Sequence, residues 1–152
     1  MRRALPLCLL LALSLSGCSY RSDFVVINES GAPVEVYYAL KEGRRIREWG
    51  IVPAKKHLKE LEDFDVQWRD LAEGQYLYDE KTGGVTIMLM PGEALRVANL
   101  NNYFDHGEDR DDSFNIESIR VTGAHGNVQY SGREARTQFA ERRRQIFAIT
   151  YR

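Results

Sequence analysis

Hydrophobic and polar residues alternate along much of this chain with a period of two, the pattern of β-strands that bury one face. The segment 33–40 reads PVEVYYAL, and its apolar face would carry Val34, Val36, Tyr38 and Leu40. The apolar run 24–27 precedes it, and the Asn-Glu-Ser-Gly sequence after that run predicts a turn. Because Tyr37 falls on the face opposite Tyr38, one of these two rings should point to solvent.

Residues 85–90 are apolar on both faces, which suits a central strand. Pro91 and Gly92 predict a turn, after which 95–100 is expected to return as the hairpin partner of 85–90.

The next strand changes phase within its own length. Phe114 and Ile116 fall on one face, whereas Ile119 and Val121 fall on the other. A β-bulge near residues 117–118 would return both pairs to the core. A turn cluster at 123–127 follows, and strands are predicted at 128–130 and at 146–151, the latter with Phe147, Ile149 and Tyr151 on one face.

One helix is predicted, late in the chain. Ser131 and Glu134 have the spacing of a capping box, and Ala135, Phe139 and Ala140 recur at near-helical spacing towards Arg143. The segment 54–73 fits neither period, so only irregular or short elements are expected there.

Seven or eight short strands with one short helix near the C-terminus predict a mainly β protein, an antiparallel β-sandwich rather than a parallel α/β sheet. A closed barrel is the alternative that strand patterns rarely separate from a sandwich. No repeat or linker divides residues 24–152, so we expect a single domain there.

The first seventeen residues have the order of an export signal. Arg2 and Arg3 form a positive start, and an apolar run of about eleven residues follows, which is too short to span a bilayer. Residues 1–17 are therefore predicted to be a signal peptide.

The end of this signal, Leu15-Ser16-Gly17-Cys18, resembles the lipobox of bacterial lipoprotein precursors. The resemblance implies that residues 1–17 are removed and that Cys18 becomes the acylated first residue, which anchors the protein in a membrane. Ser19, in place of Asp, resembles the outer-membrane sorting pattern of Gram-negative members and, for a host with two membranes, implies the periplasmic face of the outer membrane. Residues 18–23 would be a short tether of about 17 Å at most from Ser19 to the first strand.

Composition and charge narrow the class of protein further. The chain has 152 residues, with 21 Lys and Arg against 22 Asp and Glu, so it is not a strongly basic nucleic-acid binder. Removal of residues 1–17 leaves 135 residues of formal charge −3. Both cysteines, Cys8 and Cys18, lie before residue 24, so the domain has no disulfide framework.

The sequence contains no known catalytic or metal-binding motif. His57, His106 and His125 have no zinc-ligand spacing, and no serine lies in a G-x-S-x-G sequence. Gly83 and Gly84 precede a strand, so a turn explains them better than a phosphate-binding loop does. The sequence thus predicts no cofactor, no metal and no enzyme activity.

The connection between residues 100 and 114 is the main candidate for binding, because it is longer than most connections. Residues 105–112 carry five carboxylates, which suggests calcium ligands, but Arg110 and the missing EF-hand order favour a solvated acidic loop. The candidate partner-binding residues are Asn101, Asn102, Tyr103, Phe104, Asp105, Glu108, Asp109, Asp111 and Asp112.

Three functional hypotheses remain. The first is a membrane-anchored envelope lipoprotein that is not an enzyme and binds another envelope protein through this loop or an open sheet edge. The second is a periplasmic inhibitor or immunity factor that inserts the acidic loop into a basic cleft. The third is an envelope hydrolase with dispersed catalytic residues.

Overall fold

The computed structural model describes residues 20–46, 52–62, 66–102, 114–143 and 145–152. One group of strands consists of β1 (Tyr20–Asn28), β3 (Ala54–His57), β4 (Arg69–Asp70), β7 (Glu93–Asn102), β10 (Ala140–Arg143) and β11 (Ile146–Tyr151). The other consists of β2 (Val34–Leu40), β5 (Leu77–Asp79), β6 (Gly84–Leu89), β8 (Ile116–Gly123) and β9 (Gly126–Ser131). A short 3₁₀ helix, η2 (Leu58–Glu62), follows β3, and the helix α2 (Gly132–Thr137) joins β9 to β10.

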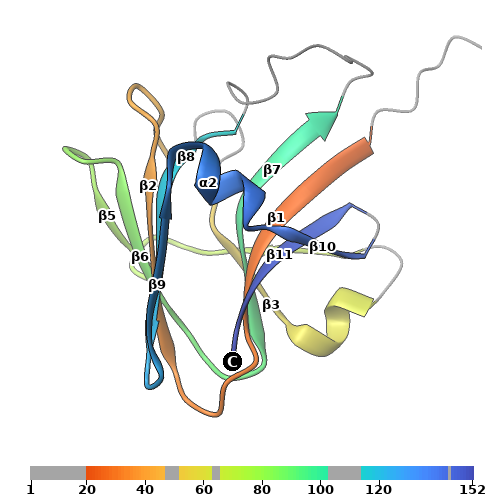
Figure 1. Cartoon of the computed structure of the whole chain (residues 1–152). Coiled ribbons are helices and arrows are strands. Elements are labelled where there is room, and N and C mark those ends of the chain that lie inside the picture. Colours follow the sequence, from red (N-terminus) through yellow and green to blue (C-terminus); the bar gives the residue numbers. More distant parts are fainter. Residues whose placement is uncertain (1–19, 47–51, 63–65, 103–113, 144) are drawn as a thin grey trace, which may run out of the picture.

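Each group forms one sheet, and the two sheets lie face to face (Figure 1). The first sheet has the order β10-β11-β1-β7-β3-β4 and the second the order β5-β6-β2-β8-β9. Neighbouring strands are antiparallel except β1 and β11, which are parallel. The predicted mainly β sandwich is confirmed. No helix of the described ranges is long and apolar enough to span a membrane.

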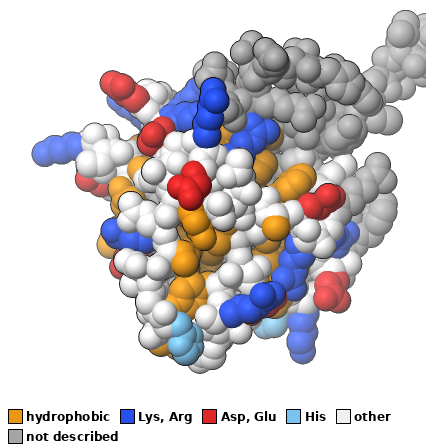
Figure 2. Space-filling view, in the orientation of Figure 1, with side chains coloured by type: hydrophobic (Ala, Val, Ile, Leu, Met, Phe, Trp, Pro, Cys, Tyr) orange, Lys and Arg blue, Asp and Glu red, His pale blue; other side chains and the backbone are white. Residues whose placement is uncertain are grey.

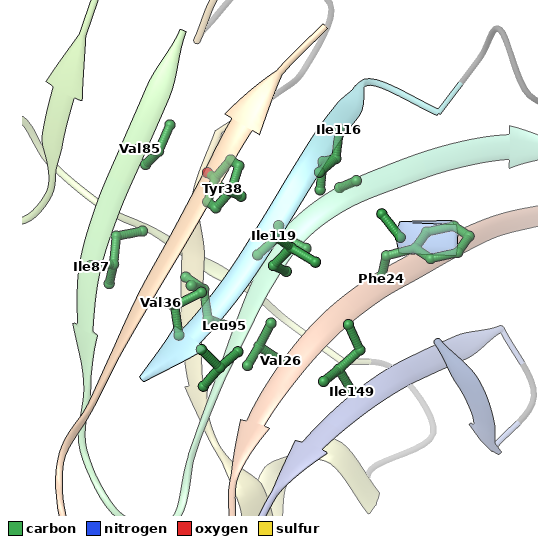
Figure 3. Packing of buried hydrophobic residues seen from close by; sticks show 14 of the residues in the cluster. Phe24, Val26, Val36, Tyr38, Val85, Ile87, Leu95, Ile116, Ile119 and Ile149 are labelled. Carbon is green, nitrogen blue, oxygen red and sulfur yellow. The ribbon is translucent and has the colours of Figure 1, made fainter. Parts of the chain in front are cut away.

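Apolar side chains of both sheets meet between the layers (Figure 3). In β2 the residues from Val34 to Leu40 alternate between buried and partly exposed, as the period of two predicts. Tyr38 is fully buried and Tyr37 is only partly buried, so the prediction for this pair is also confirmed. The outer face of the first sheet carries a smaller cluster, in which Leu61 of η2 covers Val25 and Ile27 of β1.

The predicted bulge in β8 is present. Leu40 pairs with Ile116, whereas its neighbour Ala39 pairs with Ser118, so the ladder skips Glu117. Ile116 and Ile119 are consequently both buried, although they are three residues apart. The short elements β3, η2 and β4 agree with the expectation of short or irregular structure over 54–73.

The predicted hairpin between residues 85–90 and 95–100 is wrong. β6 pairs with β5 and β2, whereas β7 lies in the other sheet between β1 and β3. The turn at Gly92 is held at the first sheet, because its N–H donates to the carbonyl of Asn28 at the end of β1 over 2.9 Å. The chain therefore crosses between layers here. Met88 of β6 is 52% exposed, so this strand is not buried on both faces.

The predicted helix is shorter than expected, and its capping box does not form. α2 ends at Thr137, and residues 140–143 belong to β10. Gly132, the first helical residue, has a φ of 55°, and the Ser131 side chain makes no capping hydrogen bond. Ser131 instead continues β9 and pairs with Ser118, so the chain turns sharply at Gly132.

The first strand begins earlier than predicted. β1 starts at Tyr20, and the backbone of residues 20–23 pairs with residues 99–102 of β7. Residues 20–23 of the expected tether are therefore part of this sheet.

The buried hydroxyl of Tyr38 has no hydrogen-bond partner among the described residues, and burial raises its pKa well above the usual value of 10.0. We expect Tyr38→Phe to raise the free energy of unfolding by about 1 kcal/mol, because it removes an unsatisfied polar group. The advantage should grow above pH 10, where the wild-type phenol ionises only in the unfolded chain. Urea denaturation at pH 7 and at pH 10.5 measures both effects.

Tyr151→Phe is the matched control for this substitution. Its hydroxyl donates to the carbonyl of Gly126 over 2.9 Å and accepts from the N–H of His125 over 3.1 Å. Loss of these bonds should lower stability by about 1 kcal/mol. A Tyr38→Phe variant that is also less stable than wild type would contradict the prediction.

Candidate functional site

The described residues form two sheets with four edge strands, and three of these strands are short or charged. β4 has two residues, both charged, and β5 has three. β10 has four residues, three of them charged, and its ladder with β11 is interrupted between Glu141 and Arg143. Short length, charge and bulges are the means by which proteins keep sheet edges from pairing with other chains.

The fourth edge strand, β9, has none of these features. Its six residues read GNVQYS and include neither a charged side chain nor proline. The ladder with β8 is unbroken from the Gly123–Gly126 pair to the Ser118–Ser131 pair. Within the described part of the chain, β9 pairs with β8 alone. Its second edge is therefore open and unprotected.

The register shows which backbone groups this edge presents. Gly123 and Gly126 flank a two-residue turn and form the first hydrogen-bonded pair of the hairpin. Bonded and non-bonded pairs alternate in an antiparallel ladder, so Val128 and Tyr130 direct their N–H and C=O groups to β8. Asn127 and Gln129 direct theirs away from β8, so these two residues present two donors and two acceptors on the open edge.

Hydrophobic side chains border this edge on its inner side. Val128 and Tyr130 of β9 are partly buried and pack against the core. The phenol of Tyr151 closes one end through its hydrogen bonds to the β8–β9 turn. In the view of Figure 2, which has the orientation of Figure 1, hydrophobic side chains reach the surface in the middle of the visible face. We call the open edge together with Val128 and Tyr130 the β9 side.

A hollow of about 250 Å³ lies at β3, and two of the basic side chains that line it form ion pairs with carboxylates. Lys55 pairs with Glu93 over 3.0 Å, and Lys56 pairs with Glu60 over 3.3 Å. Lys55 also donates to the carbonyl of Met88 in the opposite sheet. This lysine therefore joins the two layers, which is a structural role.

A second polar cluster covers the outer face of the first sheet. The indole N–H of Trp68 donates to Asp23 over 2.7 Å, and the buried Arg96 pairs with Asp70 over 3.1 Å. The Arg96 guanidinium lies 5.4 Å from the Trp68 ring, and burial lowers the pKa of Arg96. These contacts hold the segment around Trp68 over β1 and β7, so this face is covered by the chain itself.

The outer face of the second sheet carries scattered apolar side chains. Leu77 and Met88 are 74% and 52% exposed. On the strands β2 and β8, the guanidinium of Arg120 lies 5.1 Å from the centre of the Tyr37 ring and 3.9 Å from the carboxylate of Glu35. Tyr37 and Arg120 thus contact each other, whereas Leu77 and Met88 are each more than half exposed.

The residues predicted from sequence fall largely outside this site. The backbone of Asn101 and Asn102 pairs with β1 at the end of β7. Residues outside the described ranges are Cys18, Tyr103, Phe104, Asp105, His106, Glu108, Asp109, Asp111 and Asp112. His57 and His125 are exposed, and the described residues contain no group of three His, Cys, Asp or Glu that could hold a metal ion.

The sequence predicts a strand at 128–130 but gives no sign that this strand lies at an edge. The only available signal is the neutral composition of residues 126–131, which differs from the charged segment 140–143. Comparisons with protein-family models, with curated proteins and with solved structures find no match for this chain.

Proposed function

We propose that this protein is a membrane-anchored lipoprotein of the bacterial envelope that is not an enzyme and binds another envelope protein through the β9 side. The observation that carries the binding role is the open edge of β9, which is long, neutral and regular, whereas the other three edges are short or charged. The lipobox at Cys18 supports the anchor.

The position of β1 supports a domain held close to the membrane. Since β1 begins at Tyr20, only Ser19 would separate the acylated Cys18 from the sheet. Two residue steps of extended chain span about 7 Å. In a host with two membranes, Ser19 favours the periplasmic face of the outer membrane, and the end of the sandwich at which β1 begins would face the bilayer.

The chemistry of the β9 side favours a protein partner. Unpaired backbone donors and acceptors on a sheet edge are complementary to another backbone, and a partly exposed Tyr ring is typical of protein interfaces. Neither feature would suit a nucleic acid, which needs basic residues, and β9 has none.

Affinity purification from detergent-solubilised envelopes of the native host tests the binding role. Wild-type protein and two variants, Gln129→Lys in β9 and Leu77→Lys in β5, are compared by quantitative mass spectrometry. Gln129→Lys should recover about tenfold less partner, because its charge would lie where a partner packs on the edge. Leu77→Lys adds the same charge to the opposite edge strand and should recover as much as wild type.

The variants are chosen to leave folding unchanged, because both side chains are exposed. Equal recovery by all three proteins would exclude the β9 side, and loss with Leu77→Lys alone would move the site to β5. A wild-type protein that recovers no partner above an untagged control would contradict the proposed function itself.

A further inference from the structure

The β9 edge presents backbone groups in a pattern that determines how a partner can bind. Asn127 and Gln129 direct two N–H and two C=O groups outward, at alternate positions of a regular strand. We infer that the partner contributes one extended segment, which pairs with β9 as a sixth strand of the β5-β6-β2-β8-β9 sheet. This inference rests on the proposed function and specifies the chemistry of the partner.

The surroundings of β9 determine the side chains of that segment. Side chains of a strand alternate between faces, so every second residue of the added strand would lie beside Val128 and Tyr130, on the face that packs against the core. These positions take apolar residues. The residues between them would lie beside the exposed Asn127 and Gln129, where polar uncharged side chains fit.

Both ends of the β9 edge limit the length of the segment. Tyr151 is bonded to the turn before β9, and the chain turns away into α2 after Ser131. β9 has six residues, so the partner segment is expected to be about equally long. The segment is therefore short, extended and alternating, with no charge at its centre.

A second copy of this chain is the other possible occupant, and symmetry argues against it. Two β9 strands related by a twofold axis run antiparallel. β1 begins at the end of the sandwich near α2 (Figure 1), so the two Cys18 residues would lie at opposite ends of such a pair. With a connection of about 7 Å, both anchors could enter one leaflet only if both domains lay flat on it. A segment of a different protein avoids this constraint.

Proline at position 129 tests strand addition directly. Gln129→Pro removes an outward N–H without breaking a bond to β8, and proline is tolerated on edge strands. We expect this variant of the full lipoprotein to bind the partner recovered by the wild type at least about tenfold more weakly, because the added strand loses one bond and meets the proline ring. Gln129→Ala keeps the N–H and should bind within about twofold of wild type, as exposed side-chain truncations do.

Photo-crosslinking in intact cells identifies the occupant. Benzoylphenylalanine is placed at position 127 in one protein and at position 129 in another, and crosslinked peptides are mapped by mass spectrometry. Both positions should label one partner segment, at sites two residues apart in an alternating apolar and polar sequence.

Several results would overturn the inference while leaving a protein-binding role intact. Binding by Gln129→Pro equal to that of Gln129→Ala would show that the partner contacts side chains alone. Crosslinks scattered over several segments would exclude an added strand. Crosslinks to residues 126–131 of a second copy would replace the foreign segment with a dimer.

Discussion

Replacing Asn28 by alanine is expected to lower the free energy of unfolding by about 3 kcal/mol, because the substitution leaves buried backbone groups without partners. Asn28 is fully buried at the end of β1. Its side-chain N–H₂ donates to the carbonyls of Leu89 and Ala32, each over 2.9 Å. Its side-chain oxygen accepts from the N–H of Ser30 over 3.0 Å and from the Ser30 hydroxyl over 2.6 Å.

The bond to Leu89 makes this effect larger than that of an ordinary turn residue. Asn28 belongs to the first sheet and Leu89 to the second, so one side chain joins the two layers. The backbone carbonyl of Asn28 also accepts from Gly92, which holds the crossing between β6 and β7 in place. Loss of the side chain should therefore weaken both the contact between the sheets and the β6–β7 crossing at this end of the sandwich.

Ser30→Ala is the matched control, since it removes one hydroxyl from the same network and keeps the amide of Asn28. It should cost about 1 kcal/mol, a typical value for a single hydrogen bond. Urea denaturation followed by tryptophan fluorescence measures both variants. If Asn28→Ala and Ser30→Ala lower the free energy of unfolding equally, and each by less than about 1 kcal/mol, the network does not join the layers.

Elements set by local alternation could be predicted from the sequence. The buried positions of β2 and the bulge at Glu117 follow from which residues must face one core, and both are confirmed. The same reasoning gave the buried face of β11, where Ile149 and Tyr151 are buried and Phe147 is partly buried. In each case the information lies within a few residues of the feature it determines.

The connection between strands could not be predicted in this way. Pro91 and Gly92 predict a turn, and a turn is present. A Pro-Gly turn can, however, connect either two strands of a hairpin or two strands in opposite sheets. The difference lies in the bond from Gly92 to Asn28, more than sixty positions earlier. Likewise, Asn28 was identified only as part of a turn, because its bond to Leu89 exists only when both sheets are assembled.

The helix shows a conflict between two local signals. Ser131 and Glu134 have the spacing of a capping box, yet Ser131 is also the last residue of a strand that pairs with β8. The ladder determines the backbone of Ser131, and the positive φ of Gly132 then starts the helix abruptly. Tertiary pairing prevails over the cap, whose loss costs only about 1 kcal/mol.

The candidate site illustrates the same division between local and long-range information. Residues 128–130 are predicted as a strand, but whether that strand is central or at an edge depends on the order of strands in space. The long acidic connection is conspicuous in the sequence because of its length and charge. A neutral edge strand is not conspicuous in the sequence, because an edge strand is distinguished only by the absence of a neighbouring strand on one side in the folded protein.

Replacing Cys18 by serine is expected to abolish incorporation of labelled palmitate, because the resemblance to a lipobox implies that this thiol is the acylation site. Acyl chains contribute about 0.8 kcal/mol per buried CH₂, so two or more chains give stable anchoring. A second protein, in which an unrelated cleavable export signal replaces residues 1–18, should therefore move from the membrane pellet to the soluble fraction. Metabolic labelling and ultracentrifugation of cell lysates measure the two effects.

Cys8→Ser is the matched control, because it removes the chain's other thiol from the part that the resemblance assigns to the discarded signal. This variant should be labelled and anchored like wild type. Labelling of Cys18→Ser at the wild-type level would exclude the proposed anchor. If the exported domain without Cys18 still sediments with membranes, Gln129→Lys separates two causes. Release by Gln129→Lys would indicate that a membrane-bound partner retains the domain at the β9 side, whereas continued sedimentation would require a direct contact between the domain and the lipid surface.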